Sequence, residues 1–313
     1  MDWDTFIRWR IFLEHRFTSF FFGNYFYAVC MVSLCLCSFA QLGHRHIPIL
    51  FIAIAAAATV YYYNHSYLLE SYDSTPNQRN NWVREHAGQI KKIQWLLLTF
   101  IIGGGSYQLF TLHPGIELLE PYDIFYCCLI GIGAFLYYFD TKKYPWLNLR
   151  SYGIIKPLVI GSIWAGIGVF TPYLFLKLTN QTYQGMAHMP ILFISNALYI
   201  SIIALLFDIK DFESDANKQM KTLVVRMGLT KTINWIVLPM SALILIATLR
   251  YGYLHGFTGY QILLNTIPLI LLISVSYQMY QRKSILYYLA IIDGLIVVKA
   301  ACGLIATLLF SIQ

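Results

Sequence analysis

The sequence predicts an all-α integral membrane protein, a bundle of about nine transmembrane helices folded as a single domain over residues 1–313. Hydrophobic residues make up 58% of the chain and charged residues only 12%, which is far from the composition of a soluble domain. Several apolar runs approach the roughly 20 residues that a helix needs to cross a bilayer. No polar stretch between them reaches the roughly 50 residues of a small soluble domain.

Nine apolar runs are candidates for membrane spans. In chain order they cover residues 20–42, 47–63, 93–111, 122–139, 154–176, 188–207, 231–250, 260–280 and 284–310. The segment before them, residues 1–19, mixes charges with Trp3, Phe6 and Trp9. That mixture is typical of an amphipathic helix lying at the membrane interface.

The distribution of basic residues sets the expected orientation. With nine spans and a cytoplasmic N-terminus, 18 of the 22 Lys and Arg residues fall on the cytoplasmic side, three fall outside and Lys299 lies within a span. Such an asymmetry follows the positive-inside rule. We therefore expect an integral protein of a bacterial inner membrane with its C-terminus outside. The net charge of +7 is then explained by membrane lipid, and no nucleic acid partner is expected.

Two of the later spans carry features beyond hydrophobicity. The fifth contains Gly161, Gly166 and Gly168, small residues that let helices approach closely. At its start, Lys156 precedes a proline, and we expect this lysine to turn inward to a polar site. In the ninth, Asp293 and Lys299 are candidate site residues because ionisable groups inside membranes are costly. They lie about 120° apart on a straight helix and do not form a simple pair.

The most unusual stretch follows the sixth span, where four carboxylates fall within the eight residues 208–215. If the helix continues, Asp208, Asp211 and Asp215 share a face about 60° wide. Carboxylates so close repel one another unless a cation lies among them. Oxygen ligands on one face suit Mg²⁺, which uses few carboxylates and bridges to substrate phosphates. A solvated acidic face beside the membrane is the alternative interpretation.

The longest polar stretch, residues 64–92, lies on the same predicted side of the membrane. We expect Asn64, Glu70 and Asp73 to face the aspartates, with Arg79 and Arg84 available for bidentate contacts to phosphate. An ordinary charged loop would have a similar composition. The two stretches 64–92 and 208–230 are therefore the predicted cytoplasmic loops of an active site.

Asp208, Asp211 and Asp215 are followed by the segment Lys221-Thr222-Leu223-Val-Val-Arg-Met-Gly228. This pattern closely resembles the second aspartate-rich motif of the UbiA superfamily of intramembrane prenyltransferases. The nine-span plan, the loops after spans two and six, and Lys156 also match. The specific motif covers about twenty residues, whereas the architectural resemblance covers essentially the whole chain, including a central cavity.

The first aspartate-rich motif of that superfamily is degenerate in this chain. Only Asn64 matches in register, while His65, Leu68 and Tyr72 stand where the family has carboxylates. Glu70 and Asp73 are the nearby carboxylates that could add metal ligands. The departure affects one of the two metal sites that the resemblance implies.

The resemblance implies a Mg²⁺-dependent transfer of an isoprenyl group from a prenyl diphosphate to a lipophilic acceptor. Asp208, Asp211 and Asp215 would hold the metal, and Lys156 would join them in catalysis. Lys221, Arg79, Arg84 and Asn64 would bind the diphosphate. Two alternatives stay open: a relative that has lost transfer chemistry but still binds an isoprenoid or its diphosphate, and a membrane transporter or structural protein.

Overall fold

The computed structural model of the protein describes residues 16–73, 78–138, 149, 152–181, 183–217, 222–281 and 283–309. Within these ranges the chain is helical and has no strand, as the composition predicts. The α-helices are α2 Tyr25–Gln41, α3 Ile49–Asp73, α4 Gln78–Glu85, α5 Ala87–Leu112, α6 Pro121–Tyr138, α7 Lys156–Ala165, α8 Thr171–Leu178, α9 Met189–Asn217, α10 Leu223–Met227, α11 Leu229–Thr232, α12 Leu238–Leu254, α13 Gly259–Gln278, α14 Ile285–Tyr287 and α15 Gly294–Leu309.

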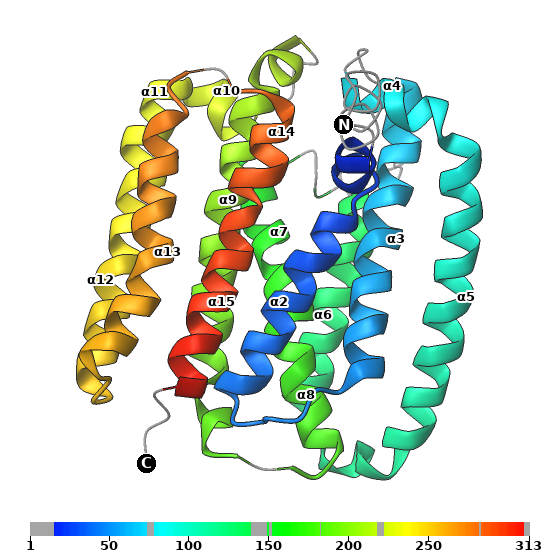
Figure 1. Cartoon of the computed structure of the whole chain (residues 1–313), viewed down its shortest axis with the longest axis vertical. Coiled ribbons are helices and arrows are strands. Elements are labelled where there is room, and N and C mark those ends of the chain that lie inside the picture. The colour runs from blue at the N-terminus through cyan, green and yellow to red at the C-terminus, as the bar shows by residue number, and fades with distance from the viewer. Residues whose placement is uncertain are drawn as a thin grey trace, which may run out of the picture.

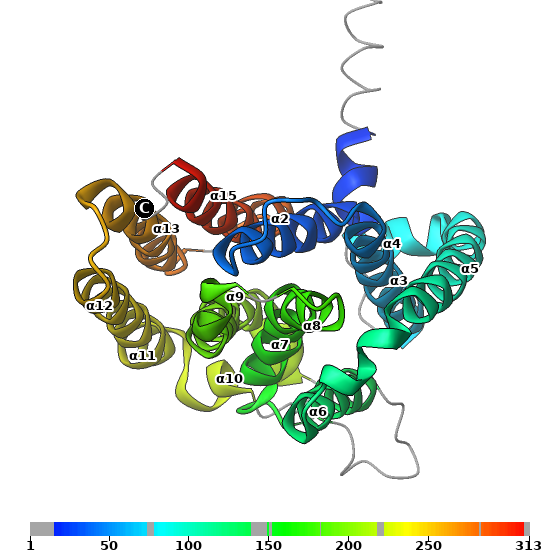
Figure 2. The same cartoon turned by 90° about the horizontal axis from the view of Figure 1, so that it is seen from below.

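The long helices run side by side along the long axis of the molecule (Figure 1). One end carries α4, α10, α14 and Asp208 and is called the aspartate end. The opposite end carries the turns 42–48, 179–188 and 255–258 and is called the far end. Seen from the far end, α7, α8 and α9 lie in the middle, and α13, α15, α2 and α3 form a row beside them (Figure 2). The bundle thus surrounds α9, the helix that carries the aspartates.

Three pairs of helices are joined by π-helical turns, so that each pair forms one membrane-spanning unit. These turns cover Gly166–Phe170, Ile233–Val237 and Tyr288–Ile292, between α7 and α8, α11 and α12, and α14 and α15. A 63° bend separates the helix Arg16–Phe22 from α2. Most of the predicted interfacial segment 1–19 lies outside the described residues.

Six described helical segments are long and apolar enough to cross a membrane, and the bent pair ending in α2 would be a seventh. The apolar part of α6, Pro121–Tyr137, is shorter, and α3 is polar along its last third. Both run beside the others (Figure 1). Large apolar side chains such as Trp95 and Phe110 are 72% and 80% exposed on α5, as expected for a surface that faces lipid. The chain is an integral membrane protein, and the count of nine spans stays a prediction.

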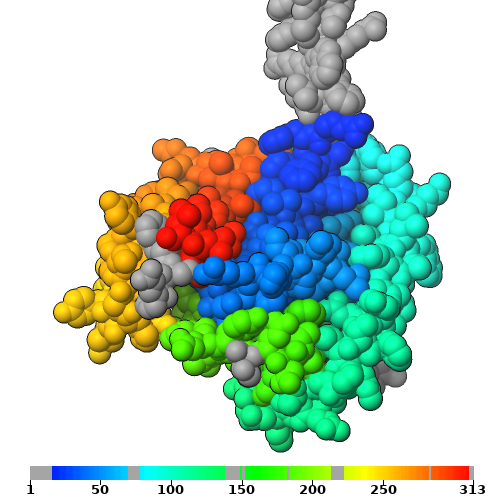
Figure 3. All heavy atoms as spheres, turned by 60° about the horizontal axis from the view of Figure 1, so that its bottom comes forward, coloured from blue at the N-terminus to red at the C-terminus, as the bar shows by residue number. Residues whose placement is uncertain are grey.

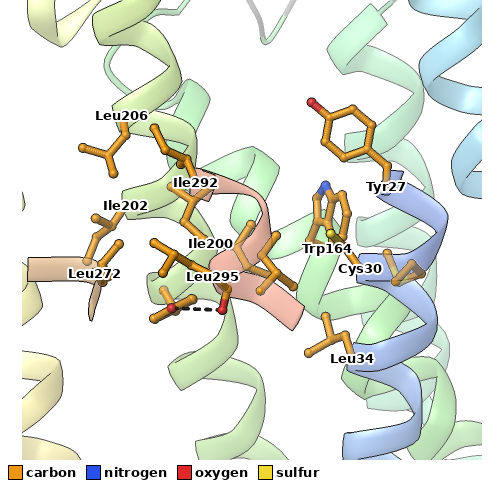
Figure 4. Packing of buried hydrophobic residues seen from close by; sticks show 14 of the residues in the cluster. Tyr27, Cys30, Leu34, Trp164, Ile200, Ile202, Leu206, Leu272, Ile292 and Leu295 are labelled. Atoms are coloured by element: carbon orange, nitrogen blue, oxygen red, sulfur yellow. Dashed lines mark hydrogen bonds between the residues drawn. The ribbon is translucent and has the colours of Figure 1, made fainter. Parts of the chain in front are cut away.

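The core lies between α2, α7, α9, α13 and α15 and consists of closely packed aliphatic and aromatic side chains. Ile202 and Leu206 of α9, Leu272 of α13 and Ile292 are fully buried in it (Figure 4). Such a core holds the helices at fixed positions because packed interiors resist even small changes in volume.

Gly161 brings α7 into close contact with α9. A Cβ atom on Gly161 would lie 2.2 Å from the Ala197 carbonyl oxygen and 2.2 Å from the Ser201 hydroxyl. Lys156 and Asp208 follow on these two helices toward the aspartate end. The predicted role of this glycine in close packing is confirmed. The close approach of the two helices places Lys156 and Asp208 opposite each other.

The segments expected as loops begin as helix. α3 continues through Asn64 to Asp73, and α9 continues through Asp208 to Asn217. Neither extension contains a Gly or Pro, and each residue added to an existing helix gains a backbone hydrogen bond without a new nucleation cost. The residues 64–73 and 208–217 are therefore helical, which differs from the predicted loops 64–92 and 208–230.

Replacing Gly161 with valine is expected to destabilise the protein by about 1–3 kcal/mol, because the new side chain has no space against the α9 backbone. The measurement is the midpoint of thermal unfolding of the purified protein in an uncharged detergent. Gly103→Val on α5 is the control, since no atom lies within 4 Å of a Cβ atom there. Equal midpoints for the two variants would contradict the α7–α9 contact.

Candidate functional site

Asp208 and Lys156 form a buried ion pair at the aspartate end. The Lys156 ammonium donates a hydrogen bond to Asp208 Oδ1, and the two side chains are only 12% and 2% exposed. Lys156 is the first residue of α7, and its contact with Asp208 shows that its side chain turns inward, as predicted. The attraction between these two opposite charges offsets the free-energy cost of removing each of them from water.

The three aspartates lie on one continuous helix, because α9 extends from Met189 to Asn217. Asp208, Asp211 and Asp215 consequently share a helix face, as the spacing predicts. The Asp211 carboxylate is 45% exposed and lies 3.3 Å from the Lys210 ammonium. The side chain of Asp215 is outside the described part of the structure. The acidic face thus runs from a buried carboxylate to a half-exposed one.

Arg79 forms a second polar group at the same end, here called the arginine cluster and consisting of Asn24, Asn64, Tyr67 and Arg79. Arg79 is 1% exposed and donates hydrogen bonds to the Tyr67 hydroxyl, at 2.8 Å, and to Asn24 Oδ1. The Asn24 amide in turn donates to Asn64 Oδ1 at 2.7 Å. The four residues come from α3, α4 and the bend before α2, so the cluster ties three segments together.

The guanidinium of Arg79 stays charged although it is buried. Burial alone would lower its pKa, but the nearby phenols of Tyr67 and Tyr27 and the carboxyl of Asp293 raise the pKa above its usual value. Among the described residues, its Nε has no hydrogen-bond acceptor. A buried charged donor that still has capacity is suited to an anionic ligand.

Asp293 connects the arginine cluster with the acidic face. It is 3% exposed and lies within electrostatic reach of both Arg79 and Lys210. Lys299, six residues further on, instead donates a hydrogen bond to Asn196 at 2.6 Å. Asp293 and Lys299 therefore lie in different environments, as their spacing predicts.

An aromatic group lies next to the arginine cluster. The rings of Tyr27 and Tyr63 stack with centroids 4.1 Å apart, and Trp164 Nε1 donates to the Tyr63 hydroxyl at 2.8 Å. Tyr27 lies directly above Trp164 on one side of the packed core in Figure 4. These ring faces can stabilise a cation by their quadrupoles.

The other predicted residues are placed less centrally or are not described. Arg84 is exposed on α4 and lies outside the arginine cluster. Lys221 and the side chains of Glu70 and Asp73 are outside the described part of the structure. In the segment that follows Lys221, buried Thr222 caps α10 by accepting a hydrogen bond from the Val225 amide, and Gly228 has a φ of 79°, which favours glycine.

Sequence reasoning missed Asn24, Tyr27 and Trp164 as parts of this region. Asn24 follows Gly23 inside an otherwise apolar run, a dipeptide that can signal a break in a helix. Its φ of 65° confirms that the helix is interrupted there. Tyr27 and Trp164 carried no comparable signal, since the chain has 24 tyrosines and 7 tryptophans.

The described residues at the aspartate end supply only part of a binding site for a divalent cation. Among the described His, Cys, Asp and Glu residues, no three lie close enough together to hold a metal ion. The described carboxylates, Asp208 and Asp211, are oxygen donors of the type that Mg²⁺ prefers, and both are neutralised by an ammonium group. The two described carboxylates alone do not make a metal site, and a complete one would need further ligands such as Asp215, Glu70 or Asp73.

No family model matches the sequence, and no curated protein matches it. Two solved structures match its fold. The first, from work on digeranylgeranylglyceryl phosphate synthase in membranes, has a TM-score of 0.57 and 13% identity, covering 93% of this chain and 98% of that one. The second, a UbiA homologue from Aeropyrum pernix K1 without ligand, has a TM-score of 0.59 and 12% identity, covering 90% and 98%.

Replacing Asn24 with alanine is expected to lower the free energy of unfolding by about 1–3 kcal/mol, because Arg79 loses a buried acceptor, with a further penalty of about 1 kcal/mol for a left-handed alanine. Asn180→Ala is the matched control, since Asn180 is exposed and also left-handed, with a φ of 53°. Thermal unfolding measures both. If the two variants lose equal stability, the hydrogen bonds of Asn24 contribute nothing.

The chain aligns over 93% of its length with the first structure and over 90% with the second, and it therefore has the UbiA fold.

Proposed function

We propose that this protein is an intramembrane prenyltransferase that transfers an isoprenyl group from a prenyl diphosphate to a lipophilic acceptor, with Mg²⁺ as cofactor. In terms of reaction class it is a transferase of alkyl or aryl groups other than methyl. The buried Lys156–Asp208 pair in a UbiA fold is the observation that carries the proposal. If the aspartates only formed a solvent-exposed acidic face, Asp208 would not be buried against a lysine inside the bundle.

The reaction breaks the bond between the allylic carbon and the diphosphate oxygen, and the electron pair leaves with the diphosphate. The acceptor then forms the new bond to the allylic carbon and loses a proton. Mg²⁺ held by Asp208, Asp211 and Asp215, with Glu70 and Asp73 as further candidates, would neutralise the leaving group.

The chain's own residues contribute positive charge and an aromatic wall. Arg79 and Lys156 are the buried cations at the aspartate end whose donors can bind diphosphate oxygens. Asn64 orients Arg79 through Asn24. Arg84 is an exposed basic group that would meet the diphosphate as it enters. Lys221, which lies outside the described residues, is a further candidate for binding it. Tyr27, Tyr63 and Trp164 would face the allylic cation and exclude water from it.

The proposed use of Arg79 also accounts for the degenerate first motif. Leu68 and Tyr72 stand in place of two carboxylates, so fewer ligands remain for a second metal ion. A charged guanidinium held by Asn24 and Tyr67 supplies positive charge at that position without a metal. Charge-assisted contacts from arginine suit phosphate geometry because its donors form a planar fork.

The activity is tested with purified protein, Mg²⁺ and labelled geranyl, farnesyl or geranylgeranyl diphosphate, following release of pyrophosphate in the presence of candidate lipophilic acceptors. Asp208→Asn is expected to lower kcat by about 100-fold or more, as for the loss of one electrostatic contact in a transition state. Chelation of Mg²⁺ should abolish turnover.

Asp123→Asn is the matched control for that variant. Asp123 is 1% exposed and pairs with Lys177 at 2.7 Å, so it is a buried aspartate–lysine pair of the same kind at the far end of the bundle. Both variants lose a buried charge, but only Asp208→Asn should lose turnover per folded molecule. Pyrophosphate release that is equal in the two variants would sink the assignment of Asp208.

Binding of the diphosphate separates the roles of the two arginines. Arg79→Gln is expected to weaken binding of geranylgeranyl diphosphate by about tenfold to a hundredfold, the equivalent of one charge-assisted hydrogen bond. Arg84→Gln should change binding by less than about threefold, because exposed charges contribute little. Isothermal titration in detergent measures both affinities. A larger effect for Arg84 than for Arg79 would contradict the placement of the diphosphate.

A further inference from the structure

A cavity opens at the far end of the bundle, between α2, α9, α12, α13 and α15. Its volume is about 700 Å³, within the range of small-molecule sites in proteins. Figure 3 looks onto the far end, where the end of α15 lies between α2 and the pair α12 and α13. The lining extends along α15 from Lys299 to Leu308, a stretch of about 14 Å of helix.

A layer of packed side chains separates this cavity from the aspartate end. On α9, Ile202 and Leu206 lie between Leu198, which lines the cavity, and Asp208. Ile202, Leu206, Leu272 and Ile292 are fully buried in the core (Figure 4). The hydroxyl of Tyr199 lies 3.2 Å from the carbonyl oxygens of both Pro268 and Leu295 and joins α9, α13 and α15 in the same layer. The far cavity is therefore a site in its own right and not the end of the candidate active site.

The charged groups of the cavity are all positive. Lys299 and Arg45 line it, and no Asp or Glu is among the lining residues in the described part of the chain. The Lys299 ammonium donates to Asn196 Oδ1 at 2.6 Å and lies 5.4 Å from the centre of the Tyr199 ring. Within the described residues Lys299 makes no ion pair. An ammonium has three donors, so Lys299 retains capacity for an anion beside Asn196.

The walls of the cavity are apolar and its mouth is polar. Leu192, Ile244 and Leu269 line the walls. At the mouth, the Tyr251 hydroxyl lies 2.7 Å from His188 Nδ1, and the Tyr251 ring stacks on His255 with centroids 3.9 Å apart. A ligand that matches this arrangement has an apolar body and an anionic group that reaches the lysine.

We propose that the far cavity binds an amphipathic organic anion, with its carboxylate or phosphate on Lys299 and Asn196 and its apolar chain against Leu192, Ile244 and Leu269. A charge buried in a membrane protein without a counter-ion is costly, and an anionic ligand would supply the missing charge. This binding is separate from prenyl transfer and does not depend on the aspartates.

The test uses the purified full chain and native mass spectrometry with three probes of equal chain length: laurate, dodecyl phosphate and dodecanol. One laurate or one dodecyl phosphate per chain is expected, and the tighter of the two identifies the preferred anion. Dodecanol should bind about tenfold more weakly than that anion, because it cannot form the charge-assisted hydrogen bond.

Two variants locate the site. Lys299→Met is expected to weaken binding of the anion by about tenfold and to remove the preference over dodecanol. Lys231→Met is the matched control, since Lys231 is exposed at the aspartate end. Ala247→Trp, at an exposed position that lines the cavity, should block both the anion and the alcohol without crowding the packed core.

The proposal is overturned if dodecanol binds the unmodified protein as tightly as the anions, or if Lys299→Met and Lys231→Met weaken binding equally. Binding that survives Ala247→Trp would also overturn it. The comparison of anion with alcohol needs no variant, so it holds even if Lys299→Met fails to fold.

Discussion

The need to compensate buried charge governs the aspartate end of this bundle. A carboxylate removed from water is stable only with a partner close by, and Asp208 has Lys156. That contact requires α7 and α9 to lie almost backbone to backbone, which Gly161 allows. The packing of two transmembrane helices and the electrostatics of the site are thus one constraint. Helix packing here has a chemical purpose as well as a structural one.

The parts of the site that follow from helical periodicity could be predicted, and those that follow from tertiary contacts could not. The shared face of Asp208 and Asp211 and the inward direction of Lys156 depend on local spacing. The contact of Arg79 with Asn24 joins residues 55 apart in the sequence, and no local sequence pattern predicts it. The membrane spans show the same division: strongly apolar runs are clear, whereas α3 mixes an apolar half with the polar residues that its position near the site requires.

The arginine cluster shows how neutral partners can hold a buried positive charge. Asn64 accepts a hydrogen bond from Asn24, which in turn accepts one from Arg79. The buried guanidinium remains charged because phenols and Asp293 surround it. A comparison of short sequence motifs alone would overlook this charge, because the cluster joins three separate segments.

The π-helical turn at Tyr288–Ile292 determines how residues of this span are counted. A turn of this kind takes up one extra residue inside an otherwise α-helical segment, so the helix on either side keeps its direction. Asp293 comes directly after the turn and lies within electrostatic reach of Arg79. A count at 100° per residue along a straight helix therefore misplaces Asp293 relative to α14 by about one residue.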